Sequence, residues 1–75
     1  FSVYPNPVAA SLNVNNTTGI RSVSIVNVVG QEVLRVNNID NNATVINTSD
    51  LNRGIYFVNV TDANGMHSSR KFIRE

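Results

Sequence analysis

The sequence predicts an all-β fold, a small Greek-key β-sandwich of about seven strands, and three observations lead to it. Short runs of alternating polar and apolar residues recur along the chain, turn-forming residues separate them, and no stretch shows the 3.6-residue period of an amphipathic helix. Short strands at such spacing, with no helices between them, favour two antiparallel sheets packed face to face.

The segment from Leu51 to Thr61 is predicted to hold the central strand, because β-branched and aromatic residues follow a turn signal there. Leu51 and Gly54 are expected to form the bend into this strand. Gly54 suits such a bend, since without a Cβ it adopts backbone conformations that are costly for other residues. None of the side chains in the segment is chemically reactive, which indicates a structural role.

Alternation assigns the side chains of this strand to two faces. Tyr56, Val58 and Val60 share one face, whereas Ile55 and Phe57 share the other, so we expect the strand to be covered on both sides near its start. A Tyr at this place is also typical of the tyrosine corner of Greek-key sandwiches, in which the hydroxyl bonds upstream backbone. The pattern alone leaves that geometry open for Tyr56.

Further strands are expected on both sides of the central one. They cover residues 11–15, 21–27, 32–36, 44–48 and 66–73. Leu12 and Val14 are predicted to point inward on the first of them, as are Val23 and Ile25 on the second, because apolar residues alternate with polar ones there.

Turn residues mark the ends of these strands. The segments 15–19 and 37–42 are read as loops, and 48–51 as one helical turn or a bend. Asn27 and Gly30 occupy the first and fourth positions of a predicted type I turn, and Asn64-Gly65 is a strong hairpin signal.

The N-terminal segment Tyr4-Pro5-Asn6-Pro7 is expected to be stiff and extended, because each Pro fixes φ and lacks an amide donor. It marks the start of a single domain that covers residues 1–75. Since the chain begins without Met, we expect this domain to be a fragment of a larger protein, one that the family resemblance described below implies is secreted.

Composition limits what 75 residues can do. The core is small and has no Cys to reinforce it, so modest stability is expected. A net charge of +1 gives no field for a polyanion, and no apolar run reaches the roughly 20 residues that span a bilayer. We therefore expect neither nucleic acid binding nor membrane insertion. Arg70, Lys71 and Arg74 gather near the C-terminus and form the one charge feature of note.

No reactive constellation emerges from the sequence. The one His, His67, precedes Ser68, but consecutive strand residues point to opposite faces, so the two are not expected to act together. The acids lie in separate turns and ends, at Glu32, Asp40, Asp50, Asp62 and Glu75. The turn from Asp62 begins like a calcium loop but lacks the further ligands, which favours a hairpin. We expect no catalytic residue, no metal site and no cofactor, and thus no enzyme.

Aromatic residues leave a second class of function open. Tyr4, Phe57 and Phe72 are compatible with a sugar-stacking platform, although packing within the sheets is the simpler reading. The alternative function is therefore a non-catalytic accessory β-sandwich for carbohydrate binding or adhesion.

The order of landmarks along the whole chain resembles one family, the type A C-terminal sorting domains of the type IX (Por) secretion system of Bacteroidetes. The landmarks are Tyr4-Pro5-Asn6-Pro7, Leu12-x-Val14, Val23-x-Ile25, Asn27-x-x-Gly30-x-x-Val33, Ser49-x-Leu51-x-x-Gly54-Ile55-Tyr56-x-Val58, Gly65 and Lys71-Phe72-Ile73. The chain departs from the pattern at Asn27, where the family often has Asp, and in having fewer Lys at its end.

The resemblance implies an immunoglobulin-like sandwich that acts as a C-terminal secretion signal. Cargo upstream of it would pass through the periplasm to the outer-membrane translocon, and a sortase-like cysteine peptidase would remove the domain at the cell surface. The recognised end would comprise Lys71, Phe72, Ile73 and Arg74. The fold landmarks would be Tyr4, Pro5, Asn6, Pro7, Gly30, Leu51, Gly54, Tyr56 and Gly65.

Overall fold

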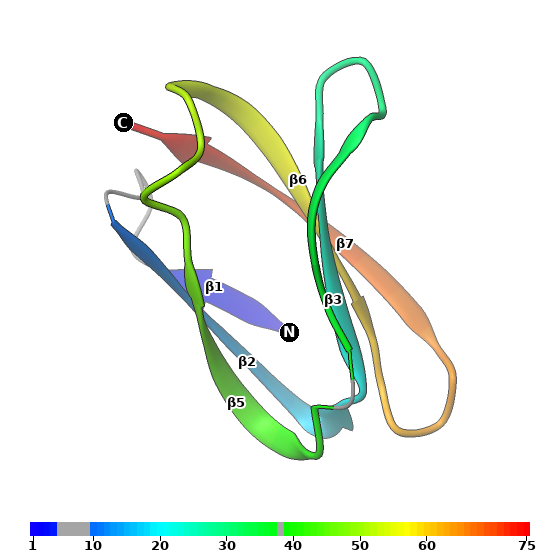
Figure 1. Ribbon diagram of the computed structural model, residues 1–75. Coiled ribbons are helices and arrows are strands. Elements are labelled where there is room, and N and C mark those ends of the chain that lie inside the picture. Colours follow the sequence, from blue (N-terminus) through cyan, green and yellow to red (C-terminus); the bar gives the residue numbers. More distant parts are fainter. Residues whose placement is uncertain (5–9, 38) are drawn as a thin grey trace.

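The computed structural model describes residues 1–4, 10–37 and 39–75, which form seven strands in two antiparallel sheets (Figure 1). The strands are β1 (Ser2–Tyr4), β2 (Ser11–Ile20), β3 (Ser22–Asn27), β4 (Glu32–Val36), β5 (Asn41–Asn47), β6 (Gly54–Thr61) and β7 (His67–Arg74). One sheet has the order β1-β2-β5 and the other β4-β3-β6-β7. The predicted all-β sandwich is confirmed, and no described residue is helical.

The connections between the strands give the immunoglobulin-like arrangement. The chain crosses between the sheets after β2, β4 and β5, while β3–β4 and β6–β7 are hairpins within the four-stranded sheet. If the strands are lettered A, B, C, C′, E, F and G in chain order, the sheets are A-B-E and C′-C-F-G. This order places β6 in the position of strand F, where sandwiches of this type have their tyrosine corner.

The core lies between the sheets and is built from the inward rows that alternation predicts. All of its side chains are at most 7% exposed. They are Leu12, Val14, Ile20, Val23, Ile25, Ile46, Tyr56, Val58, Val60 and Phe72. These residues come from β2 and β5 of one sheet and from β3, β6 and β7 of the other, so each sheet buries its apolar face against the other.

The predicted turns are confirmed at both hairpins. The Gly30 N–H donates to the Asn27 carbonyl at 3.0 Å, and the Gly65 N–H donates to the Asp62 carbonyl at 3.0 Å. At residues 48–51 the structure has a bend closed by a bond of 3.0 Å from the Leu51 N–H to the Thr48 carbonyl. That bend lies at the corner between β5 and β6, where the predicted turn leads into the central strand.

The predicted loop over residues 15–19 is wrong, because β2 continues to Ile20. Its pairing with β5 is irregular between Asn15 and Ile20. Polar side chains hold this part of the strand in place: the Asn16 Nδ2 donates to the Gly19 carbonyl at 3.0 Å, and the Thr18 hydroxyl donates to Asp62 Oδ2 at 3.0 Å. Residues 15–19 thus have a composition typical of a loop but form an irregular strand, because these side-chain hydrogen bonds stabilise it.

The two edge strands of the smaller sheet, β5 and β1, also differ from what the sequence predicts. The strand predicted over residues 44–48 begins earlier, at Asn41, and pairs along β2. Tyr4 is extended as predicted, but it belongs to β1, which pairs with β2 as an edge strand. Pro5, Asn6 and Pro7 lie outside the described residues.

Coverage of β6 on both faces is not observed. Tyr56, Val58 and Val60 face the core, whereas Ile55 is 44% exposed and Phe57 is only half-buried on the opposite face. The reason is the two-layer architecture: each sheet packs on one side, and no described element covers the outer side of the four-stranded sheet.

Candidate functional site

All four residues predicted to form the recognised end lie in β7, the edge strand of the four-stranded sheet (Figure 1). Lys71, Phe72, Ile73 and Arg74 are consecutive, so their side chains alternate between the two faces of that sheet. Phe72 and Arg74 belong to the inner row, and Lys71 and Ile73 to the outer row. The four residues therefore cannot act as one contiguous surface.

The inner row of β7 is part of the core. Phe72 is fully buried, and its ring stacks on Tyr56 with 5.7 Å between the centroids and 21° between the planes. In the folded domain this side chain is not available to fill a pocket on a partner. Its contribution to a recognised end is to hold β7 on the sandwich.

The two arginines of the inner row tie β7 to other segments. The Arg74 Nε donates to the Thr48 carbonyl at 2.9 Å, and its Nη1 bonds the Glu75 carbonyl. The Arg70 Nε donates to the Phe1 carbonyl at 2.9 Å, and its guanidinium lies 5.6 Å from the centre of the Phe1 ring. Both positive charges are thus engaged inside the domain.

The outer row is exposed and faces away from the core. Ile73 is 43% exposed, and Lys71 is exposed and makes no hydrogen bond or ion pair with the described residues. Register places Ile73 opposite Ile55 and Lys71 opposite Phe57. Sequence reasoning missed these two β6 neighbours. Counting outward from the Asn64-Gly65 turn would have found them, since Thr61 pairs with His67 and each further pair follows in step.

The fold landmarks on the described residues support the corner beside β7. The Tyr56 hydroxyl donates to the Asn52 carbonyl at 2.8 Å, so the tyrosine corner is present. Leu51 packs partly buried against the core, and Gly54 has φ of +154°, a conformation that residues with a side chain rarely adopt. Gly30 and Gly65 close the two hairpin turns described above.

The aromatic platform is not assembled. Tyr4 is 50% exposed on the outer side of β1, Phe57 lies on the outer side of the other sheet, and Phe72 is buried between the two. The three rings therefore occupy three separate layers, and the sequence-based case for a sugar-stacking surface loses its support.

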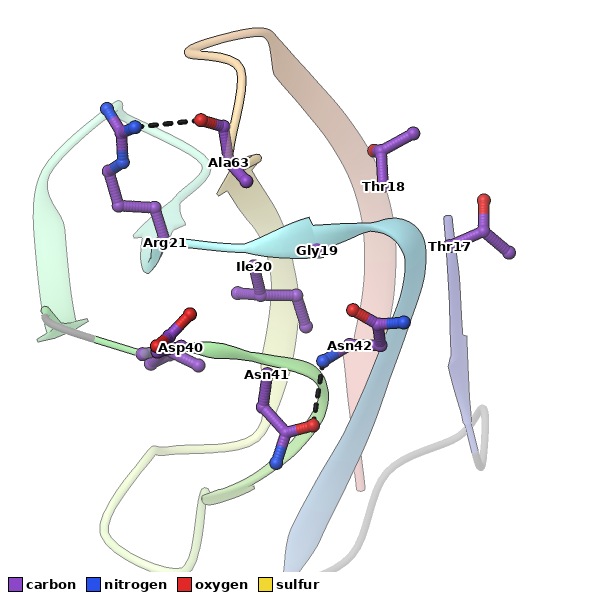
Figure 2. Close-up of a pocket in the computed structure, with 10 residues that line it drawn as sticks. Thr17, Thr18, Gly19, Ile20, Arg21, Asp40, Asn41, Asn42 and Ala63 are labelled. Atoms are coloured by element: carbon purple, nitrogen blue, oxygen red, sulfur yellow. Dashed lines mark hydrogen bonds between the residues drawn. The ribbon is translucent and has the colours of Figure 1, made fainter.

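An open groove of about 820 Å³ lies at the end of the sandwich where the β2–β3, β4–β5 and β6–β7 connections meet (Figure 2). Arg21 points toward the β6–β7 turn, where its Nη2 donates to the Ala63 carbonyl at 2.8 Å. Thr17, Thr18 and Asp40 point in different directions from the groove (Figure 2). The polar groups do not converge on one point, which a catalytic or ligand-binding site requires.

The pKa values of two carboxylates, Asp62 and Glu32, are lowered, and both carboxylates accept hydrogen bonds within the domain. Hydrogen bonds from the Met66 N–H, the Thr18 hydroxyl and the Asn64 N–H lower the pKa of Asp62, against an opposing effect of burial. This carboxylate closes the β6–β7 turn by accepting its backbone N–H groups. The segment is therefore a hairpin turn rather than a calcium loop.

Glu32 forms a similar network on the larger sheet. The Ser24 hydroxyl donates to Glu32 Oε1 at 2.7 Å and lowers the pKa of that carboxyl, as does Arg35, whose Nε is 2.8 Å away. A carboxylate with a lowered pKa is a weak base, so this Ser–Glu pair is not an activated nucleophile.

The remaining groups add no metal or nucleophile site. His67 is exposed, with its Nδ1 3.0 Å from the Thr61 hydroxyl, and Ser68 points to the opposite face as predicted. Among the described residues, no three His, Asp or Glu side chains gather as metal ligands. In the same ranges, no helix has the length and apolar character needed to cross a membrane.

A comparison of the chain with models of known protein families identifies one family whose match includes all seven strands. Residues 2–75 match the family described as Secretion system C-terminal sorting domain. The match covers nearly the whole chain, so this chain belongs to that family, the C-terminal sorting domains of type IX secretion in Bacteroidetes. No curated protein matches the chain significantly.

Membership in this family gives the domain a role that needs no catalytic or ligand-binding site. The domain is a sorting signal, and its cargo is a secreted or cell-surface protein. Such a signal needs a surface that another protein recognises.

Proposed function

We propose that this domain directs an upstream cargo from the periplasm to the type IX outer-membrane translocon, and that the outer row of β7 is part of what is recognised. A sortase-like cysteine peptidase then removes the domain at the cell surface. The family match over residues 2–75 supports the sorting role. The exposed Lys71 and Ile73 on an edge strand support the location of the recognised surface.

The structure determines how the recognised end has to be tested. Deleting residues 71–75 would remove Phe72 from the core and the Arg74 bond to the Thr48 carbonyl, so loss of delivery would report unfolding as readily as lost recognition. Point changes in the outer row avoid this difficulty, because these side chains do not fill the core.

The delivery experiment uses a reporter with an inner-membrane signal peptide, fused ahead of residues 1–75, in a type IX-competent host. We expect the reporter on the surface or in the medium. A strain without the translocon should accumulate it in the periplasm, and a reporter lacking the domain should do the same. Periplasmic retention of the complete fusion in the competent host would reject the proposal.

Removal of the domain is measured on the same delivered reporter. Its mass should be lower by about the 8.2 kDa of this chain in the competent host, and unchanged in a strain without the sortase-like peptidase. Delivered reporter that keeps the domain in the competent host would reject the removal step while leaving the sorting role in place.

A further inference from the structure

We infer that the outer face of the four-stranded sheet carries a docking patch for a protein surface that is apolar and presents a carboxylate. The outer patch consists of Val26, Ile55, Phe57, Ile73 and Lys71. This inference rests on the proposed sorting function and names the surface, and the chemistry of the partner, through which the domain is recognised.

The residues of the outer patch come from β3, β6 and β7, and the strand register shows that they are neighbours. Ile55 lies opposite Ile73, Phe57 lies opposite Lys71, and Val26 of β3 lies opposite Phe57 on its other side. Ile55 and Ile73 are 44% and 43% exposed, and Val26 and Phe57 are half-buried. The patch is therefore a continuous set of neighbours on one sheet face rather than scattered apolar residues.

Two more apolar side chains extend the patch along the β3–β4 hairpin. Val28 and Val29 are 67% and 81% exposed in the turn that follows Asn27, and Asn27 pairs with Tyr56 at this same end of the sheet. In Figure 1 this hairpin projects at the end where β6 begins. These two valines therefore lie at the same end of the sheet as Ile55 and Ile73.

The other half of the same face is polar. Its rows continue through Ser24, Asn59 and Ser69, and then through Ser22, Thr61 and His67. Ser24 and the Thr61 hydroxyl have hydrogen-bond partners within the domain, Glu32 and His67. The division of one face into a polar half and an exposed apolar half is not needed for the fold, since both halves lie outside the core.

The positive charge of Lys71 indicates that the partner presents an acidic residue. Its neighbours on the face are Ser69, Ile73, Ile55, Phe57 and Asn59, none of which is acidic. Glu32, which lies opposite Val26 on β4, is engaged with Ser24 and Arg35. An ammonium group among apolar side chains, without a carboxylate beside it, is best complemented by an acid on the occupant.

The same charge argues against other occupants. A phosphate-rich ligand or an anionic membrane needs several convergent cations, but Arg70 and Arg74 point to the inner side and bond carbonyls there. A second copy of the chain packed on the patch would bring another Lys71, and Glu75, the acid nearest to the patch in sequence, lies beyond the end of β7. A partner protein with an acidic residue at the edge of an apolar strip fits both features.

The test uses the same reporter fusion in the type IX-competent host, with quantified surface delivery. The double variant Ile55→Ser with Ile73→Ser should lower the delivered fraction about tenfold or more, as expected for the centre of an interface. Lys71→Glu should lower it strongly, while Lys71→Arg keeps the charge and should stay near the original level. The matched control is Val45→Ser, since Val45 is 63% exposed on the outer side of the other sheet.

Folding and occupancy are measured on each purified domain. Thermal unfolding should remain within about 4 °C of the original, which separates lost docking from lost stability. Equal delivery of the original and the folded patch variants would overturn the inference and leave the sorting function intact, whereas failure of the original fusion would reject the sorting function itself. A dimer that the double variant dissolves, or binding to anionic phospholipid vesicles that Lys71→Glu abolishes, would also overturn it.

Discussion

The outer faces of the two sheets differ in how their polar and apolar groups are satisfied. On the three-stranded sheet, amide side chains bond the sheet itself: the Asn13 Nδ2 donates to the Tyr4 carbonyl at 3.2 Å, and the Asn15 Nδ2 to the Tyr4 hydroxyl at 3.3 Å. On the four-stranded sheet, Ile55 and Ile73 remain exposed beside a Lys71 that has no partner among the described residues.

If the outer patch is the recognised surface, this difference separates the residues that matter for stability from those that matter for recognition. The smaller sheet presents a mostly polar face whose amides bond within the domain, with Val45 and Tyr4 exposed singly among them, as is normal for a solvent surface. The larger sheet presents exposed apolar side chains beside Lys71, and this is the face that we propose a partner protein recognises. Both faces depend on the same core, so changes in the core should affect both, and changes on either face should affect only that face.

Removing the ring of Phe72 should have the largest effect, because it empties the core that supports both faces. Phe72→Ala is expected to cost about 3–5 kcal/mol, out of a total of about 4–11 kcal/mol for a domain of this length. Urea unfolding followed by circular dichroism measures the loss. Phe57→Ala, on the outer side of β6, is the matched control and should cost clearly less; equal costs would contradict the assignment of Phe72 to the core.

Removing one hydroxyl from the tyrosine corner should have an intermediate effect. Tyr56→Phe loses the bond to the Asn52 carbonyl and should cost about 1 kcal/mol, which lowers the unfolding midpoint by about 4–8 °C. Tyr4→Phe is the control, since that hydroxyl is on the exposed face of the smaller sheet. A midpoint that falls as far for Tyr4→Phe as for Tyr56→Phe would contradict the corner's role.

Acid should destabilise the β6–β7 turn through Asp62. The pKa of Asp62 is lowered in the folded domain, chiefly by the Met66 N–H, so the unfolded chain binds the proton more tightly. The stabilisation is present above the unfolded pKa of about 3.9 and is lost as the pH falls through the lower folded value. Unfolding midpoints measured from pH 6 to pH 2 should show this loss.

The Asp62→Asn variant provides the comparison for that acid series. It should be less stable at neutral pH and should show a flatter acid dependence, because the titrating group is absent. Asp50→Asn, at an exposed position of the β5–β6 bend, should keep the original dependence. An unchanged acid profile in Asp62→Asn would show that Asp62 does not contribute.

Exposed apolar positions should give the smallest change in stability on both faces. Val45→Thr and Ile55→Thr are each expected to alter the free energy of unfolding by about 0.5 kcal/mol or less, as is usual at the surface. Denaturant titration measures both. Only the Ile55 change should reduce delivery, and a stability loss at Ile55 well above that at Val45 would place this side chain in the core rather than in the outer patch.

Much of the fold was predictable where sequence and packing agree. The alternation of Tyr56, Val58 and Val60 and the Asn64-Gly65 turn identified the central hairpin, because both signals are local. The irregular end of β2 was not predictable, since its amides and hydroxyls are typical of a loop and its support comes from the distant Asp62.

For the proposed recognised end, the sequence suggested which residues to consider but not which way their side chains point. The basic and apolar end of the chain pointed to residues 71–74, yet the sequence did not show that Phe72 and Arg74 face the interior while Lys71 and Ile73 face outward. That distinction depends on the sheet to which β7 is added and on the side that the other sheet covers. Ile55 and Phe57 were missed for the same reason.

The pairing of β6 with β7 has a consequence for quality control. Ile55 and Ile73 are distant along the chain and meet only through this pairing, which Phe72 and the Tyr56 ring hold from below. An unfolded C-terminus contains the same residues but does not display them side by side. A receptor that binds the assembled patch would therefore accept a finished domain and ignore a denatured one, so that folding acts as the proofreading step before export.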